Sequence, residues 1–207
     1  MNFNITKFAQ EVHALAVKKG WWTPAPDFAT FIALCHAELS EALEEYRNGR
    51  PMVYYHYCLR DDSSACALGK ECKRWMDGSC LNAVRPEKPQ GIAVELADCV
   101  IRMLDWCAAQ KLDVSDMHKP NTWMEPNPCV GSLPRTVAIC HGILANAYDC
   151  EDYGDDVLPG IVAEYLIDCA DFIRHWLEAQ DIDLWEIARL KHEYNKTRSY
   201  RHGNKKC

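Results

Sequence analysis

Four acidic residues in two matched pairs could together hold a divalent metal ion. Glu38 and Glu41 are three residues apart, as are Glu95 and Asp98, and on a helix this spacing puts both members of a pair on one face. Glu45 continues the first stripe. Carboxylates that face one another across two helices are costly unless cations lie between them, and Mg²⁺ or Mn²⁺ prefers such oxygen ligands. The same spacing also fits two stripes that simply face water.

Six segments have the three-to-four residue period of α-helices, and no segment has the alternating pattern of a strand. Asp27 and Asp183 are placed to cap two of these helices. The chain is 48% hydrophobic and can therefore bury a core, so we expect an all-α helical bundle. The expected helices span residues 3–19, 27–48, 91–110, 135–150, 159–180 and 183–195.

Residues 51–88 have no helical or strand period and are expected to form an irregular, cysteine-rich insertion. Four of its cysteines could close a tetrahedral Zn²⁺ site, namely Cys58, Cys66, Cys72 and Cys80. Their spacing lacks the short Cys-x2-Cys pair of well-known zinc motifs, so free thiols or a loop over the active site are the alternatives. The proline-rich residues 115–134 are expected to be a linker, and residues 196–207 a basic, loosely ordered tail.

The sequence contains two similar helix pairs. Residues 33–37 (Ala-Leu-Cys-His-Ala) resemble residues 138–142 (Ala-Ile-Cys-His-Gly), and Asp98-Cys99 matches Asp168-Cys169 in the same order. We interpret this as a duplication with the insertion in the first copy only; chance similarity of amphipathic helices is the alternative. The chain then divides into a first half, 1–114, and a degenerate second repeat, 135–195. Most of the acidic set is missing from the second copy, whose aligned residues are Ile143, Asn146, Tyr165 and Asp168.

In their context, the acidic pairs resemble those of the MazG-like nucleotide pyrophosphohydrolases, which are all-α nucleoside triphosphate pyrophosphatases, many of them phage-encoded. The resembling segments are His-Ala-Glu-Leu-Ser-Glu-Ala-Leu-Glu-Glu at 36–45, Val-Glu-Leu-Ala-Asp at 94–98, the stretch from Val12 to Trp22, and the tail from Lys191 to Gly203. The resemblance covers residues 3–113 and 181–206. The long spacer between the acidic pairs and the second helix pair both depart from the family pattern.

By this resemblance, residues 1–114 are the catalytic half of an enzyme that hydrolyses a nucleoside or deoxynucleoside triphosphate to the monophosphate and pyrophosphate, in control of nucleotide pools. The resemblance implies Glu38, Glu41, Glu95 and Asp98 as catalytic residues and ligands of Mg²⁺, or Mn²⁺, with Glu45 or Glu44 accessory. Such a metal would bridge the triphosphate and position a water, because phosphoryl transfer depends mainly on positioning and charge neutralisation. The carboxylate that takes the proton from the water is not assigned.

The same resemblance implies substrate contacts from both ends of the chain. His13 and Trp22 correspond to base-contacting positions, where an aromatic ring can hold a nucleobase; a core histidine and a core tryptophan are the alternative. The basic tail could hold phosphates, because arginine binds them through two N–H groups, or could be a solubilising terminus. Its expected substrate-binding residues are Lys191, Tyr194, Asn195, Lys196, Arg198 and Arg201.

Composition limits the partners. The formal charge of −7 argues against a protein that coats nucleic acid. No apolar run has the length of a signal peptide or a membrane span, so we expect a cytoplasmic protein without a membrane partner. The resemblance implies a homodimer, although a duplicated chain could imitate a dimer alone. Two rival functions stay open, which are a non-catalytic nucleotide-binding or interaction module and the hydrolysis of phosphoribosyl-ATP.

Overall fold

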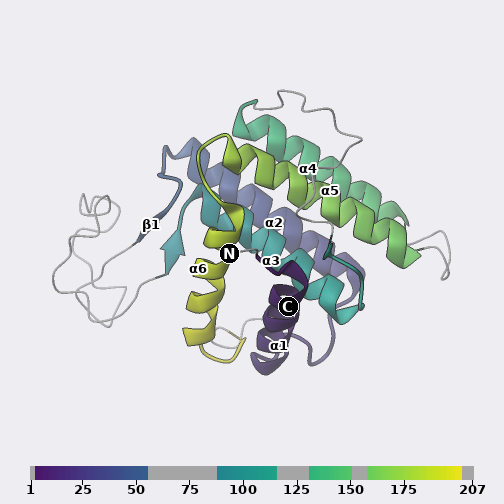
Figure 1. Cartoon of the computed structure of the whole chain (residues 1–207). Helices are drawn as coiled ribbons and strands as arrows, with labels where there is room; N and C mark the ends of the chain where they lie inside the picture. Colours follow the sequence, from purple (N-terminus) through teal and green to yellow (C-terminus); the bar gives the residue numbers. More distant parts are fainter. Residues whose placement is uncertain (1–2, 56–87, 116–130, 151–157, 202–207) are drawn as a thin grey trace.

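The computed structural model describes residues 3–55, 88–115, 131–150 and 158–201, which form six helices and one short β-ribbon (Figure 1). The helices are α1 (Ile5–Lys18), α2 (Phe28–Arg47), α3 (Ile92–Ala109), α4 (Leu133–Asp149), α5 (Leu158–Glu178) and α6 (Leu184–Thr197). The expected all-α class is confirmed, and each helix ends within two residues of its expected bounds. The caps are confirmed as well, because both aspartates accept hydrogen bonds from backbone N–H groups of the first turn. Among the described residues, none of the helices is both long and apolar enough to cross a membrane.

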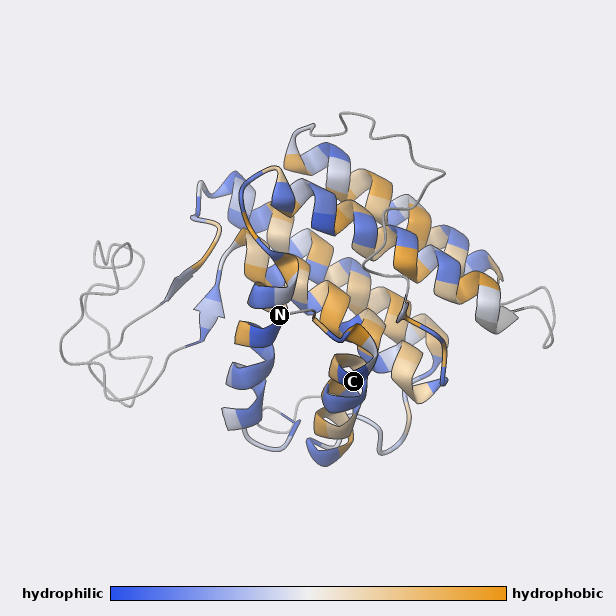
Figure 2. Cartoon of the chain, in the orientation of Figure 1, coloured by the Kyte–Doolittle hydropathy of each residue, from blue (hydrophilic) through white to orange (hydrophobic). Residues whose placement is uncertain are grey.

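Helix α3 is the centre of the fold. Helices α1, α2, α5 and α6 all pack against it, and Figure 1 shows it between the layer of α4 and α5 and the pair α1 and α6. Apolar side chains cover most of its circumference, and Figure 2 shows hydrophobic residues gathered through the middle of the bundle. Its charged residues lie in one stripe, formed by Glu95, Asp98, Arg102 and Asp105.

Helices α4 and α5 form the other layer, and α4 packs on α2. At this contact His36 meets His141, with ring centroids 4.8 Å apart and the two Nδ1 atoms 2.6 Å apart. Two cysteines also contact each other within each helix pair, at corresponding positions. Cys99 Sγ lies 3.6 Å from the Cys35 carbonyl oxygen in the first pair, and Cys140 Sγ lies 3.9 Å from the Cys169 carbonyl oxygen in the second. A residue that touches its own equivalent is typical of a two-fold axis. The packing is therefore compatible with a duplication, which itself stays a prediction.

A β-ribbon corrects the expectation that the chain has no strand. β1 (Tyr54–Tyr55) pairs antiparallel with β2 (Pro89–Gln90) and closes the base of the insertion. Strands of two residues are too short to show an alternating pattern in the sequence. Gly91 follows β2 with φ +114°, and a Cβ there would lie 2.6 Å from the carbonyl oxygens of Pro51 and Met52, so only glycine fits this junction. The four cysteines that could close a zinc site, Cys58, Cys66, Cys72 and Cys80, lie outside the described residues, so this alternative is not tested.

The start of the basic tail is more ordered than its composition suggests. Helix α6 packs against α3 and continues to Thr197, and the backbone N–H of Arg201 donates to the carbonyl of Lys19 at 3.0 Å. Residues 202–207 lie outside the described part of the chain, as does most of the predicted linker, whose last two residues belong to α4. Contacts with α1 and α3, which composition does not encode, order the residues as far as Arg201.

The histidine contact between α2 and α4 predicts a pH-dependent stability. Burial lowers the pKa of His36 below its ordinary value of about 6.5, and burial with the adjacent His36 lowers the pKa of His141. The unfolded chain then binds more protons at these two histidines near pH 6, so their contribution to the free energy of unfolding is complete above about pH 6.5 and is lost as the pH decreases. Urea unfolding between about pH 7.5 and about pH 5 should show a shallower decline in the His36→Gln/His141→Gln variant. Identical pH slopes of the unfolding free energy in the wild-type protein and the variant would contradict this account. A residual slope is expected in the variant, because burial also lowers the pKa of His192.

Candidate functional site

Three of the four predicted acids converge between α2 and α3. Ligand oxygens of Glu38, Glu95 and Asp98 all lie within 4.8 Å of one another, close enough to share one metal ion. Glu38 and Glu95 are only 5% and 4% exposed. The three-residue spacing puts Glu95 and Asp98 on one side of α3, and Glu38 reaches them from α2. These three residues are called the acidic cluster below.

The other glutamates of α2 lie around this cluster and not in it. Glu41 is exposed and lines the adjoining pocket. Glu45 accepts a hydrogen bond from the hydroxyl of Tyr54 at 3.0 Å, which connects α2 to the β-ribbon. Glu44 accepts hydrogen bonds from Arg47 and Asn48 at the end of α2. Glu41 therefore lies beside the pocket, where its predicted role as a metal ligand stays a prediction. The carboxylates of Glu45 and Glu44 accept hydrogen bonds from other residues instead.

Cations of the protein itself balance much of the negative charge. Arg102 donates through Nε at 2.8 Å and Nη2 at 2.6 Å to one carboxylate oxygen of Glu38. Lys191 Nζ lies 3.0 Å from Asp98 Oδ2 and 3.5 Å from Glu95 Oε2, and its side chain is 1% exposed. From the sequence, we expected metal ions to neutralise these acids, and this stays a prediction. In the structure, part of the neutralisation comes from the protein itself, because α6 brings Lys191 into the cluster from far along the chain.

Burial and neighbouring charges shift the pKa values of the acidic cluster in different directions. Burial, together with repulsion from Asp98, raises the pKa of Glu38 to about 7. Burial also raises the pKa of Glu95, against the opposing charge of Lys191. Burial acts on Asp98 too, but there the charges of Lys191 and Arg102 outweigh it and the pKa is lowered. A divalent cation at these carboxylates would release protons, because it binds their ionised form.

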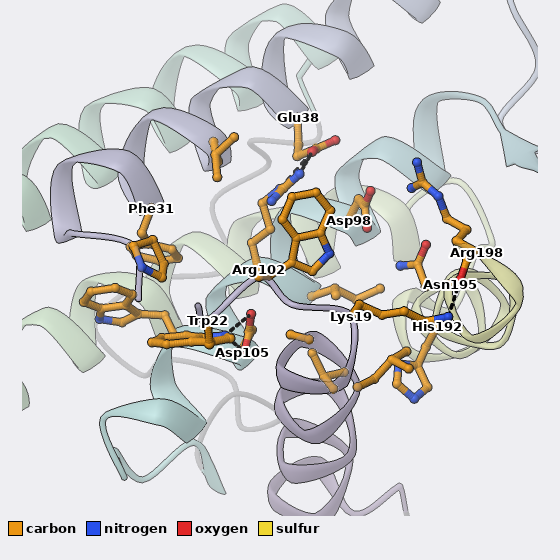
Figure 3. A pocket seen from close by; sticks show the side chains of 18 of the residues that line it. Lys19, Trp22, Phe31, Glu38, Asp98, Arg102, Asp105, His192, Asn195 and Arg198 are labelled. Carbon is orange, nitrogen blue, oxygen red and sulfur yellow. Dashed lines mark hydrogen bonds and ion pairs between the residues drawn. The ribbon is translucent and has the colours of Figure 1, made fainter. Parts of the chain in front are cut away.

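A pocket of about 340 Å³ adjoins the acidic cluster (Figure 3). At one end it is lined by charged groups that include Glu38, Asp98 and Arg198. The other end is aromatic, because Phe31 and Trp106 stack with ring centroids 4.8 Å apart, and Trp22 lies 6.0 Å from Trp106. In Figure 3, Trp22 and Phe31 lie on the opposite side of the pocket from Arg198. The pocket thus combines a highly charged end with a flat apolar end.

His13 and Trp22, the residues predicted to contact the base, are both held by Asp105. Trp22 Nε1 donates to the two carboxylate oxygens at 3.0 and 3.1 Å, and His13 Nδ1 lies 2.7 Å from Oδ1. Of the two, only Trp22 lines the pocket directly. Sequence reasoning gave no role to Asp105 or Arg102. Both continue the stripe of Asp98 at helical spacing, and this spacing is the signal that could have identified them.

Two of the predicted tail residues, Asn195 and Arg198, line the pocket. Asn195 Oδ1 is buried, and among the described residues it is the one buried side-chain nitrogen or oxygen without a hydrogen-bond partner. A buried acceptor left without a partner costs about 1–3 kcal/mol. Buried polar atoms are therefore nearly always paired. Asn195 Oδ1 is therefore placed to accept a hydrogen bond from a ligand or to contact a ligand's cation.

The remaining tail residues do not face the pocket. Lys196 is exposed and pairs with Glu193 at 2.5 Å. Arg201 donates through Nε to the carbonyl of Gly20 at 3.1 Å. Tyr194 is half-buried on α6, outside the residues that line the pocket. Only part of the basic tail is therefore placed to meet a ligand in this pocket.

The ion pair of Lys191 predicts strong coupling to the acidic cluster. Lys191→Met would leave buried carboxylates without their ammonium, so we expect a loss of roughly 3 kcal/mol in the free energy of unfolding without divalent cations. Asp98→Asn should recover part of that loss, with a coupling energy above about 1 kcal/mol in a double-mutant cycle of urea unfolding. The control Lys7→Met removes an exposed pair with Glu11. It should change stability by less than about 0.5 kcal/mol. Additive losses from Lys191 and Asp98 would show that the pair is not coupled.

Comparison of the chain with protein-family models, with curated proteins and with solved structures gave no match. The likeness to MazG-like enzymes therefore rests on the sequence motifs alone. What the protein does must be argued from the acidic cluster and the pocket beside it.

Proposed function

We propose that this protein is a divalent-metal-dependent nucleoside triphosphate pyrophosphohydrolase, which converts a nucleoside or deoxynucleoside triphosphate and water to the monophosphate and pyrophosphate. The observation that carries the proposal is the shared pocket, which has the acidic cluster at one end and stacked aromatic rings at the other. A nucleotide has the same division, since its phosphates need cations and its base needs a flat apolar surface. The motif resemblance supports the same reaction.

The donor set of the acidic cluster fits Mg²⁺ or Mn²⁺. Three carboxylates from two packed helices offer hard oxygen ligands within 4.8 Å of one another. Glu38, Glu95 and Asp98 would hold the ion, with Glu41 at the pocket edge. Bound there, the ion would neutralise phosphate charge and acidify a water. Lys191 shares these carboxylates, so its ammonium would be available to balance the charge of an incoming phosphate.

The chain's own residues would do the rest of the binding. Arg198 and Lys88 bring positive charge to the pocket, which would attract phosphates. Trp22, fixed in orientation by Asp105, would contact the base next to the ring of Phe31. Asn195 Oδ1 would find its missing partner in the bound complex. Together these groups would position the phosphate chain relative to the acidic cluster, which phosphoryl transfer requires.

The duplication would make one such site complete within a single chain. Helices α4 and α5 lie on α2 and α3 through the His36–His141 contact. We infer that this second pair does the structural work of a second subunit without acids of its own. A homodimer, as the resemblance implies, would then form through another surface and would not be needed to complete the pocket.

The proposed reaction predicts Mg²⁺-dependent release of pyrophosphate and not of phosphate from at least one member of a panel of nucleoside triphosphates. Glu38→Gln or Asp98→Asn should lower this turnover by at least roughly 100-fold, because each removes a charge that holds the ion. The matched control Glu44→Gln changes an exposed acid of the same helix and should keep full turnover. Circular dichroism should show native helix content in every variant.

Unchanged turnover in Glu38→Gln and Asp98→Asn would remove the acidic cluster from the mechanism. Phosphoribosyl-ATP is assayed beside the panel, and preference for it would redirect the substrate. Nucleotide binding without any turnover would favour the non-catalytic binding module.

A site complete within one chain predicts that activity does not depend on self-association. Pyrophosphate release per chain should stay constant as the protein is diluted from about 10 μM to about 10 nM, a range that dissociates weak dimers. Light scattering at the same concentrations reports the assembly. A rate per chain that falls in step with loss of a dimer would contradict the internal pairing.

A further inference from the structure

Two chain segments that line different sides of the pocket are hydrogen-bonded to each other at its edge. One is the end of α1 with the residues that follow it, and the other is the end of α6 with residues 198–201. Lys19 is the C-cap of α1, and its Nζ donates to the carbonyl oxygens of Lys196, at 2.8 Å, and of Arg198. Arg198 is in turn the C-cap of α6. A cation at the C-terminus of a helix is stabilised by the exposed carbonyls and by the helix dipole.

Hydrogen bonds also run in the opposite direction, from the second segment to the first. The backbone N–H of Arg201 donates to the carbonyl of Lys19 at 3.0 Å, and its Nε donates to that of Gly20 at 3.1 Å. The same guanidinium also donates to the carbonyl of Thr23. In each segment, one cationic side chain therefore donates to backbone carbonyl groups at the end of the other segment. Lys19 and Arg201, with these carbonyls, are called the clasp below.

The two segments also fit each other closely in shape. Gly20 has φ +85°, and a Cβ at this position would come within 2.2 Å of the ring of Tyr200. The positive φ favours glycine at residue 20, and the missing Cβ leaves room for the aromatic ring of the other segment.

The clasp connects groups that belong to different walls of the pocket. Trp21 and Trp22 follow Gly20 directly and line one wall, and Asn195 and Arg198 at the end of α6 line another. Helices α1 and α6 both pack on α3. Toward the start of α1, Phe8 meets His192 with ring centroids 5.3 Å apart. At their C-terminal ends, hydrogen bonds made by Lys19 and Arg201 link these helices.

We propose that Lys19 and Arg201 are positioning residues, which hold the Trp22 wall and the Arg198 wall at a fixed separation so that one ligand meets both. Arg201 thereby acts through the backbone and not by touching phosphate. The proposal rests on the proposed function for the identity of the ligand, a nucleoside triphosphate. The clasp itself can be measured without any ligand.

The test compares Arg201→Met and Lys19→Met with the wild-type protein and with Lys18→Met, a control that removes the neighbouring exposed lysine. Hydrogen–deuterium exchange should become faster in residues 19–27 in both clasp variants, with amides of α3 unchanged. With Mg²⁺ and the preferred nucleotide, KM should rise about tenfold while kcat changes less than about twofold, because the clasp contributes uniform binding. Lys19→Arg keeps a cation that reaches the same carbonyls and should restore both values.

The outcomes separate the clasp from the proposed function. Wild-type exchange rates in Arg201→Met and Lys19→Met would overturn the clasp, whether or not the protein hydrolyses nucleotides. Faster exchange with unchanged KM, or a fall in kcat alone, would overturn its role in positioning the two walls. Absence of pyrophosphate release from the wild-type protein would overturn the proposed function, and the exchange comparison would still decide whether the clasp holds the segments together.

Discussion

The fold depends on how the charges of its central helix are balanced. Helix α3 is buried on most sides, yet it carries charged groups in one stripe. A buried charge is very costly unless an opposite charge or hydrogen bonds compensate it. Each helix along the stripe supplies a partner, with Glu38 of α2 at Arg102, Lys191 of α6 at Asp98, and His13 of α1 at Asp105. These pairs connect α1, α2 and α6 to α3, beside the apolar packing of the same helices.

The same pairs make an acidic site compatible with a stable protein before a ligand binds. Arg102 and Lys191 compensate the acids, but burial still raises the pKa values of Glu38 and Glu95. In the proposed function, a divalent cation and an anionic phosphate arrive together and keep the local charge nearly balanced. Such a complex would also give a partner to Asn195 Oδ1, which has none among the described residues. In this proposal, stability and ligand binding use one set of charges.

The second helix pair completes the core and carries little of the acidic set. Helix α4 covers α2, and His36 meets its aligned residue His141 between them. The positions aligned with Glu38 and Glu95 are Ile143 and Tyr165, so this half has little of the acidic set.

The sequence alone determined the six helices and the placement of Glu95 and Asp98 on one side of α3, because caps such as Asp27 and the three-residue spacing act through local helix geometry. Only the tertiary structure decided which side chains meet across helices. It placed Lys191 among the acids and turned Arg201 to the end of α1. It also paired two-residue strands too short to leave a pattern. Such contacts depend on how whole helices pack, and local spacing carries no information about that.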